Sequence, residues 1–177
     1  LRMDTSQVII NEERPQLTKH LATRFKEKIG QNVNLLGEVV LGNEEADHRY
    51  HHYLEALESP DINYISVKIS GIYAQTHALN YEESFPELVS RMSALYQKAI
   101  DFPYTDEDGI KRSKFINLDM EEYKDAHFTL RLFKAVLNLP QFKNYSAGIV
   151  VQAYLPDAYD FQTELLEFAK ARVDGGG

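Results

Sequence analysis

The stretch YISVKIS, residues 64–70, alternates apolar and polar side chains and predicts a β-strand with two unlike faces. One face carries Ile65, Val67 and Ile69, and the other carries Ser66, Lys68 and Ser70. A strand that helices cover on both faces is normally apolar on both. The lysine therefore indicates that one face packs on helices while the other carries polar groups.

Three further stretches repeat this strand pattern, and an amphipathic helix pattern follows each of the four. The other strands are predicted at residues 32–38, 114–120 and 148–154, and the helices at residues 43–59, 81–100, 121–139 and 157–172. Parallel strands need crossover connections, which helices normally supply. The sequence therefore predicts a parallel α/β sheet, with one more helix before it at residues 15–30 and a polar surface loop at 101–113.

Each predicted strand has a polar side chain toward its C-terminal end, opposite the apolar face. These four residues are Glu38, Lys68, Asp119 and Gln152. In a (β/α)8 barrel the outer face of the sheet packs on helices, and reactive groups collect at the C-terminal ends of the strands. Four such units predict the first half of a (β/α)8 TIM-type barrel. The alternative is a sheet with one face open to water, on which the four side chains are only solvated.

The domain organisation follows from the same pattern. Residues 1–31 are expected to form an N-terminal helical arm, and residues 32–177 are expected to form the partial barrel. A half barrel leaves two strand edges and its inner face uncovered. We therefore expect the chain to form a homo-oligomer in which those surfaces meet.

Composition narrows the functional classes. The 177 residues include no cysteine, which excludes disulfides and thiolate chemistry, and the formal net charge of −8 disfavours a nucleic-acid partner. No apolar run approaches the roughly 20 residues of a membrane-spanning helix, and the start has no visible export signal. We expect a cytoplasmic protein.

Two local motifs raise the question of a metal site. His48 and His52 stand one helical turn apart, a spacing compatible with a shared ion, but no third ligand accompanies them. The acidic stretch TDEDG, residues 105–109, lacks the ligand spacing of a calcium loop. We therefore predict a solvated helix face, a turn, and no metal. The glycine-rich motifs of nucleotide-binding folds do not occur either.

Four motifs together resemble a known family. They are VNLLGE (33–38), ISVKIS (65–70), INLDMEE (116–122) and VVQAY (150–154). In this order and spacing they are similar to the proline dehydrogenase domain of bacterial proline-utilisation flavoenzymes, over about residues 32 to 172. The resemblance implies a (β/α)8 barrel that binds FAD and oxidises L-proline to Δ1-pyrroline-5-carboxylate, in the catabolism of proline to glutamate. It also implies that electrons pass to a quinone, with at most peripheral contact with the inner membrane.

The resemblance implies roles for the four polar residues. Lys68 resembles the family lysine that faces the proline carboxylate, and Asp119 resembles the aspartate beside the substrate and the flavin. Gln152 resembles the glutamine that hydrogen-bonds the isoalloxazine, and Glu38 resembles the glutamate that pairs with a substrate-binding arginine. These roles are physically reasonable because a lysine among apolar neighbours is less hydrated than in water and attracts an anion more strongly.

The sequence also departs from the family pattern. The family's later strand with an arginine and a lysine, and its final helix with paired arginines, do not occur in these 177 residues. Asn34 stands where an aspartate is expected in many relatives. We therefore expect a fragment of an FAD-dependent proline dehydrogenase that neither binds FAD tightly nor oxidises proline in isolation. The alternative is a stand-alone α/β scaffold or small-molecule-binding domain without catalysis.

Overall fold

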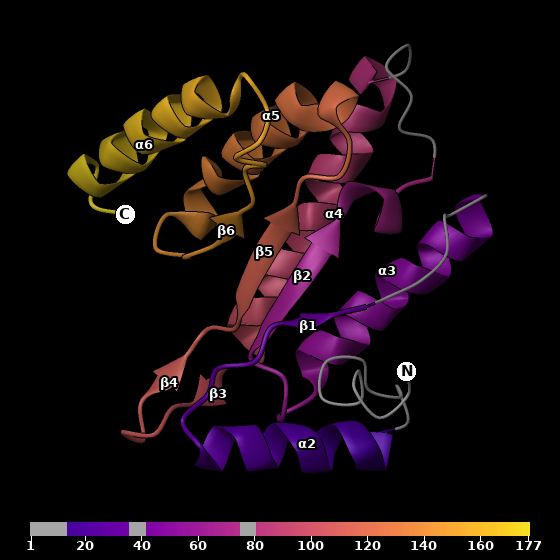
Figure 1. Ribbon diagram of the computed structural model, residues 1–177, viewed down its shortest axis with the longest axis vertical. Coiled ribbons are helices and arrows are strands. Elements are labelled where there is room, and N and C mark those ends of the chain that lie inside the picture. Colours follow the sequence, from indigo (N-terminus) through magenta and orange to yellow (C-terminus); the bar gives the residue numbers. More distant parts are fainter. Residues whose placement is uncertain (1–13, 36–41, 75–80) are drawn as a thin grey trace.

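The computed structural model describes residues 14–35, 42–74 and 81–177, which form a parallel sheet covered on one face by helices (Figure 1). The four strands lie in the order β1-β2-β5-β6, and every neighbouring pair is parallel. Their bounds are β1 Val33–Asn34, β2 Tyr64–Lys68, β5 Phe115–Asp119 and β6 Gly148–Ile149. The helices that follow them are α3 Asn43–Glu58, α4 Tyr81–Asp101, α5 Ala126–Leu137 and α6 Ala158–Asp174. The predicted series of four β-α units is confirmed.

The hydrophobic core lies between the sheet and the helices. Ile65, Val67, Ile116 and Leu118 point toward the helices and are at most 1% exposed. They join one continuous cluster with buried side chains of α3, α4 and α5, among them Leu57, Met92 and Leu132. Burying side chains of this size contributes about 1.5 to 3 kcal/mol each. The apolar strand faces are therefore the helix-facing ones, as the alternation in YISVKIS predicted.

The register between β2 and β5 fixes which polar residues are neighbours. Ile65 is opposite Ile116, Ser66 is opposite Asn117, and Lys68 is opposite Asp119. A slip of one residue would turn the apolar side chains of a strand away from the helices, so burial specifies this register strongly. The core thereby places the polar residues of both strands side by side on the inner face.

The N-terminal ends of the strands are covered by two elements (Figure 1). One is the helix α2, Arg14–Lys26, and the other is a hairpin of β3 Tyr104–Thr105 and β4 Lys111–Arg112. The polar surface loop predicted at 101–113 therefore contains a short hairpin that the sequence did not indicate. Asp106 stabilises the hairpin turn by accepting the backbone N–H groups of residues 108 and 110 at 3.0 and 2.8 Å. Hydrogen bonds to Arg112 and to these amides lower the pKa of Asp106.

The fourth strand is shorter than predicted. Only Gly148 and Ile149 pair with β5, because the chain turns soon afterwards with a hydrogen bond from the amide of Leu155 to the carbonyl of Gln152. Gly148 allows the close approach to β5, since a Cβ there would lie 2.6 Å from Oδ1 of Asn117. The helix after β5 also begins later than predicted, at Ala126, after a 3-10 turn η3 at Tyr123–Asp125.

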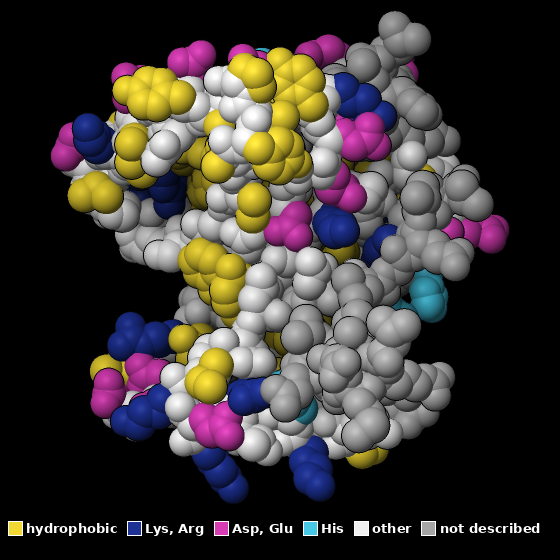
Figure 2. Space-filling view, in the orientation of Figure 1, with side chains coloured by type: hydrophobic (Ala, Val, Ile, Leu, Met, Phe, Trp, Pro, Cys, Tyr) yellow, Lys and Arg dark blue, Asp and Glu magenta, His cyan; other side chains and the backbone are white. Residues whose placement is uncertain are grey.

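Exposed hydrophobic side chains gather over α5 and α6 on the face shown in Figure 2. Tyr154 and Tyr159 are the most exposed large hydrophobic residues of the described chain, at 79% and 76%. None of the described helices is long and apolar enough to cross a membrane.

Candidate active site

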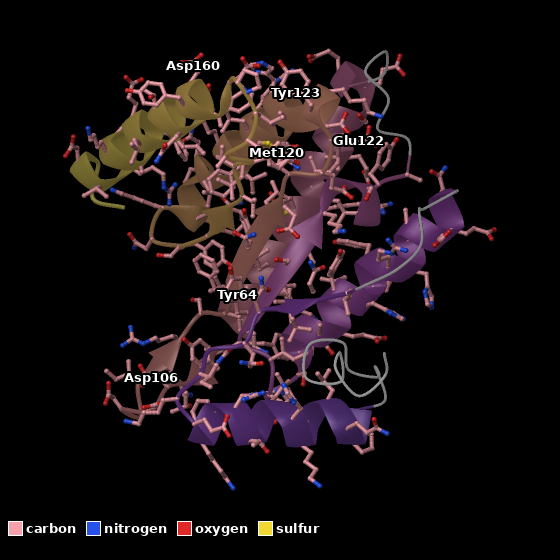
Figure 3. All side chains as sticks on the ribbon, in the orientation of Figure 1. Tyr64, Asp106, Met120, Glu122, Tyr123 and Asp160 are labelled. Carbon is pink, nitrogen blue, oxygen red and sulfur yellow. The ribbon has the colours of Figure 1, made fainter. Side chains whose placement is uncertain are left out.

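Two of the predicted site residues meet at the C-terminal end of the sheet. Lys68 is the last residue of β2 and Asp119 the last residue of β5, and the strand register makes them neighbours. Figure 3 shows this end of β5 through Met120, Glu122 and Tyr123, with Tyr64 and Asp106 toward the opposite end. Glu38, the third predicted residue, lies outside the described residues, so its role stays a prediction.

Asp119 is held from two strands. The amide of Asn117 donates to its Oδ1 at 2.8 Å, and the amide of Asn34 on β1 approaches its Oδ2 at 3.4 Å. Asn117 is buried, and its own position is fixed by the β2–β5 register. Two amide donors on one carboxylate leave little freedom for the carboxylate to rotate. Asn34, where relatives are expected to carry an aspartate, therefore presents a hydrogen-bond donor to Asp119 through its amide.

Lys68 has a different environment. Its side chain is half-buried, and its ammonium makes no hydrogen bond or ion pair with any residue in 14–35, 42–74 or 81–177. A partly desolvated cation without a carboxylate partner attracts an anionic ligand more strongly than one in water. Lys68 is therefore suited to bind a carboxylate on the inner face of the sheet.

Gln152 joins this end of the sheet from the segment after β6. Its Nε2 donates to the carbonyl oxygens of Met120 and Glu121, both at 3.1 Å. These two bonds use both amide hydrogens, and no donor of the described chain contacts its Oε1. Gln152 can thus accept a hydrogen bond from a ring N–H of a ligand. The C-terminal end of the sheet therefore carries a hydrogen-bond acceptor on Gln152, the cation of Lys68 and the anchored carboxylate of Asp119.

Two further residues, Glu121 and Tyr53, lie near this end of the sheet, and the sequence did not indicate a role for either of them. Glu121 accepts the backbone N–H of Ser70 at 3.2 Å, between the segments that follow β5 and β2. Tyr53 of α3 packs behind the end of β2, and a Cβ on Gly71 would lie 2.9 Å from its hydroxyl oxygen. Tyr53 is fully buried in the core, and this burial raises its pKa to about 12.

The histidines considered as metal ligands lie elsewhere, on α3. The rings of His48 and His52 stand 4.2 Å apart between centroids. Within the part of the chain that the structure describes, no group of three or more His, Asp or Glu side chains is arranged to hold a metal ion.

A comparison with models of protein families identifies the family of this chain. A family model described as proline dehydrogenase matches residues 17–175, which is most of the chain. The chain belongs to the proline dehydrogenase family. This confirms the resemblance that the four strand motifs indicated. A search of curated proteins gave no match.

Solved structures agree with this membership. Proline Utilization A from Corynebacterium freiburgense is 38% identical over 100% of this chain, with a TM-score of 0.89. Proline Utilization A from Bdellovibrio bacteriovorus, inactivated by N-propargylglycine, is 28% identical over 88% of the chain, with a TM-score of 0.72. The proline dehydrogenase chain described here spans 18% of each of these two proteins. The predicted fold, part of a TIM-type barrel with a helix before it, is confirmed.

Proposed function

We propose that this chain supplies Lys68, Asp119 and Gln152 to the active site of an FAD-dependent proline dehydrogenase that oxidises L-proline to Δ1-pyrroline-5-carboxylate. The observation that carries the proposal is the half-buried ammonium of Lys68, which pairs with no other described residue, next to an anchored Asp119. Family membership supports the reaction. It also favours this function over the alternative of a scaffold without catalysis.

The charges of the site match those of the substrate. L-Proline carries a carboxylate, which Lys68 binds, and a cationic nitrogen, which the carboxylate of Asp119 attracts. The asparagine amides keep Asp119 pointed at the substrate, and Gln152 holds the edge of the cofactor through Oε1. Bound FAD would supply the acceptor for a hydride from the substrate carbon. The cationic nitrogen loses one proton to solvent before the hydride leaves, the C=N bond then forms as a protonated imine, and loss of a second proton gives the neutral product.

The proposal extends to partners. A quinone takes the electrons, the protein is cytoplasmic with at most peripheral contact with the inner membrane, and the chain self-associates. The exposed hydrophobic side chains that gather over α5 and α6 support self-association, because exposed apolar surface favours burial in a contact (Figure 2).

The isolated 177 residues are proposed to lack activity. In the isolated chain, Lys68 alone would bind the carboxylate of proline, because the family's paired arginines do not occur in this sequence. Purified chain should show no flavin absorbance and no proline-dependent reduction of a dye. Robust dye reduction by the isolated chain would overturn this part of the proposal.

A chimera tests the function itself. Residues 1–177 replace the matched segment of the Corynebacterium freiburgense protein, which aligns over 100% of this chain. The chimera should bind FAD and reduce a dye with L-proline, and Lys68→Met should lower kcat/KM about 100-fold because it removes a charge-assisted contact with the carboxylate. Lys124→Met is the control, since Lys124 is an exposed lysine that pairs with Glu122. A chimera that binds FAD but does not oxidise proline would contradict the proposal. A Lys68→Met variant with unchanged kcat/KM would contradict it as well.

A further inference from the structure

Lys68 and Gln152 approach the proposed site from segments that are far apart in sequence, so something must fix their relative positions. Lys68 ends β2 and is also the N-cap of a short 3-10 helix, η1 Ile69–Gly71. The first N–H groups of a helical turn have no partner within the turn. No side chain of the cap residue supplies one here. The direction in which Lys68 leaves the sheet therefore depends on what binds the start of η1.

Glu121 supplies this partner. Its Oε2 accepts the N–H of Ser70 at 3.2 Å, across 51 residues of sequence, and Ser70 lies two residues after Lys68. A carboxylate that accepts a backbone N–H makes a stronger hydrogen bond than a neutral acceptor. The same residue binds the other segment through its backbone, because its carbonyl oxygen accepts Nε2 of Gln152 at 3.1 Å. One residue thus contacts the segments that carry Lys68 and Gln152.

The turn η1 also packs closely against α3. Behind it, Gly71 packs so closely on α3 that a Cβ would lie 2.9 Å from the Tyr53 hydroxyl and 3.1 Å from the Arg49 side chain. The turn is therefore held between α3 on one side and Glu121 on the other.

We propose that Glu121 is a positioning residue that sets Lys68 at the distance from Gln152 that substrate and cofactor require. This inference rests on the proposed function. Glu121 acts through Ser70 and through its own carbonyl, without touching the substrate. The next residue, Glu122, offers a matched control, because it is exposed and its ion pair among the described residues is with Lys124 in its own segment.

The first arm of the test uses the full 177-residue chain and needs no flavin. Amide hydrogen exchange of Ser70 is measured by NMR in the wild type and in Glu121→Ala, Glu121→Gln and Glu122→Ala. Loss of one charge-assisted hydrogen bond should speed exchange at Ser70 about tenfold in Glu121→Ala. Glu121→Gln keeps an acceptor oxygen and should stay close to the wild type, as should Glu122→Ala.

The second arm uses the chimera and separates KM from kcat. Glu121→Ala should raise the KM for proline about tenfold with a smaller change in kcat, because Lys68 binds the carboxylate equally in the ground and transition states. Glu121→Gln should restore the KM. Unchanged exchange at Ser70 in Glu121→Ala, or a Glu121→Gln variant as impaired as Glu121→Ala, would overturn the positioning role. A chimera that binds FAD without oxidising proline would instead overturn the proposed function, while the exchange of Ser70 still reports on Glu121.

Discussion

Two lysines at opposite ends of the central strands show how differently one residue type can be used. Lys68 stands at the C-terminal end of β2, half-buried, and its ammonium contacts no side chain in the described parts of the chain. Lys114 stands just before β5 at the N-terminal end, 1% exposed, and its ammonium donates to the carbonyl of Ser59. The comparison distinguishes a lysine that is suited to bind a ligand from a lysine whose hydrogen bond is part of the folded structure.

The contacts of Lys114 explain why it is tolerated in the core. Its backbone N–H donates to the carbonyl of Ala99 at 3.0 Å, and its carbonyl accepts the hydroxyl of Tyr145 at 3.0 Å. The residue therefore joins the end of α4, the segment after α3 and the loop before β6. Burial lowers its pKa to about 8, opposed by the nearby charge of Asp61.

The largest expected difference between the two lysines is in catalysis. In the chimera, Lys68→Met should lower kcat/KM about 100-fold, which corresponds to about 2.7 kcal/mol of transition-state binding. Lys114→Met should stay within about threefold at pH 7.5, because it acts far from the C-terminal ends of the strands. Steady-state kinetics with proline measure both, and equal losses in the two variants would remove the distinction.

The second difference is in the pH dependence of stability. A lysine whose pKa is lower in the folded than in the unfolded state destabilises the fold when protonated, so stability rises as the pH passes from about 8 toward 10.5. The free energy of unfolding should increase by about 2 kcal/mol between pH 7.5 and 9.5. Urea unfolding of the full chain measures it. Lys114→Met should remove this increase and Lys68→Met should retain it; the reverse pattern would show that the two lysines are wrongly assigned.

A third, smaller effect concerns the neighbour of Lys68. Asp119→Asn keeps the size of the side chain but removes the negative charge that faces the substrate nitrogen. The kcat/KM of the chimera should fall about tenfold, as expected for one charge-assisted contact. Asp101→Asn is the control at the end of α4, where Asp101 accepts a hydrogen bond from Gln97 on the surface. An Asp119→Asn variant with wild-type kinetics would show that the anchored carboxylate has no part in binding.

The smallest expected effect is a change in the free energy of unfolding, from a contact at the N-terminal end of the strands. Tyr145→Phe removes the hydroxyl that donates to the carbonyl of Lys114 and should lower the free energy of unfolding by about 1 kcal/mol. Tyr154→Phe, at a residue that is 79% exposed, should change it by less than about 0.5 kcal/mol. Denaturant unfolding of both variants under one set of conditions gives the comparison, and a Tyr145→Phe variant as stable as the wild type would mean that this contact adds nothing.

The sequence predicted the sheet because strand alternation is a local signal. The faces of residues 65–69 and 116–119 follow from this alternation, and the parallel sheet follows from the succession of β-α units. The hairpin at 104–112 and the early end of β6 did not, because they depend on Asp106 in one turn and on a hydrogen-bonded turn at 152–155 in the other.

The residues that support the site could not be predicted from the sequence, for a different reason. Glu121 meets Ser70 across 51 residues, and no spacing rule connects two such positions. Lys114 had no distinguishing signal, since its burial depends on the ends of α3 and α4 meeting at β5. Lys68 could be selected because its polar side chain interrupts an apolar strand close to the C-terminal end.

The glycine at the start of β6 has a consequence for anyone who redesigns this protein. Any side chain at Gly148 would collide with the amide group of Asn117, which also orients the carboxylate of Asp119. A substitution there could turn that carboxylate without altering a single residue that faces the substrate. Libraries intended to change substrate preference should therefore keep position 148 fixed, or include it as a deliberate means of turning the carboxylate.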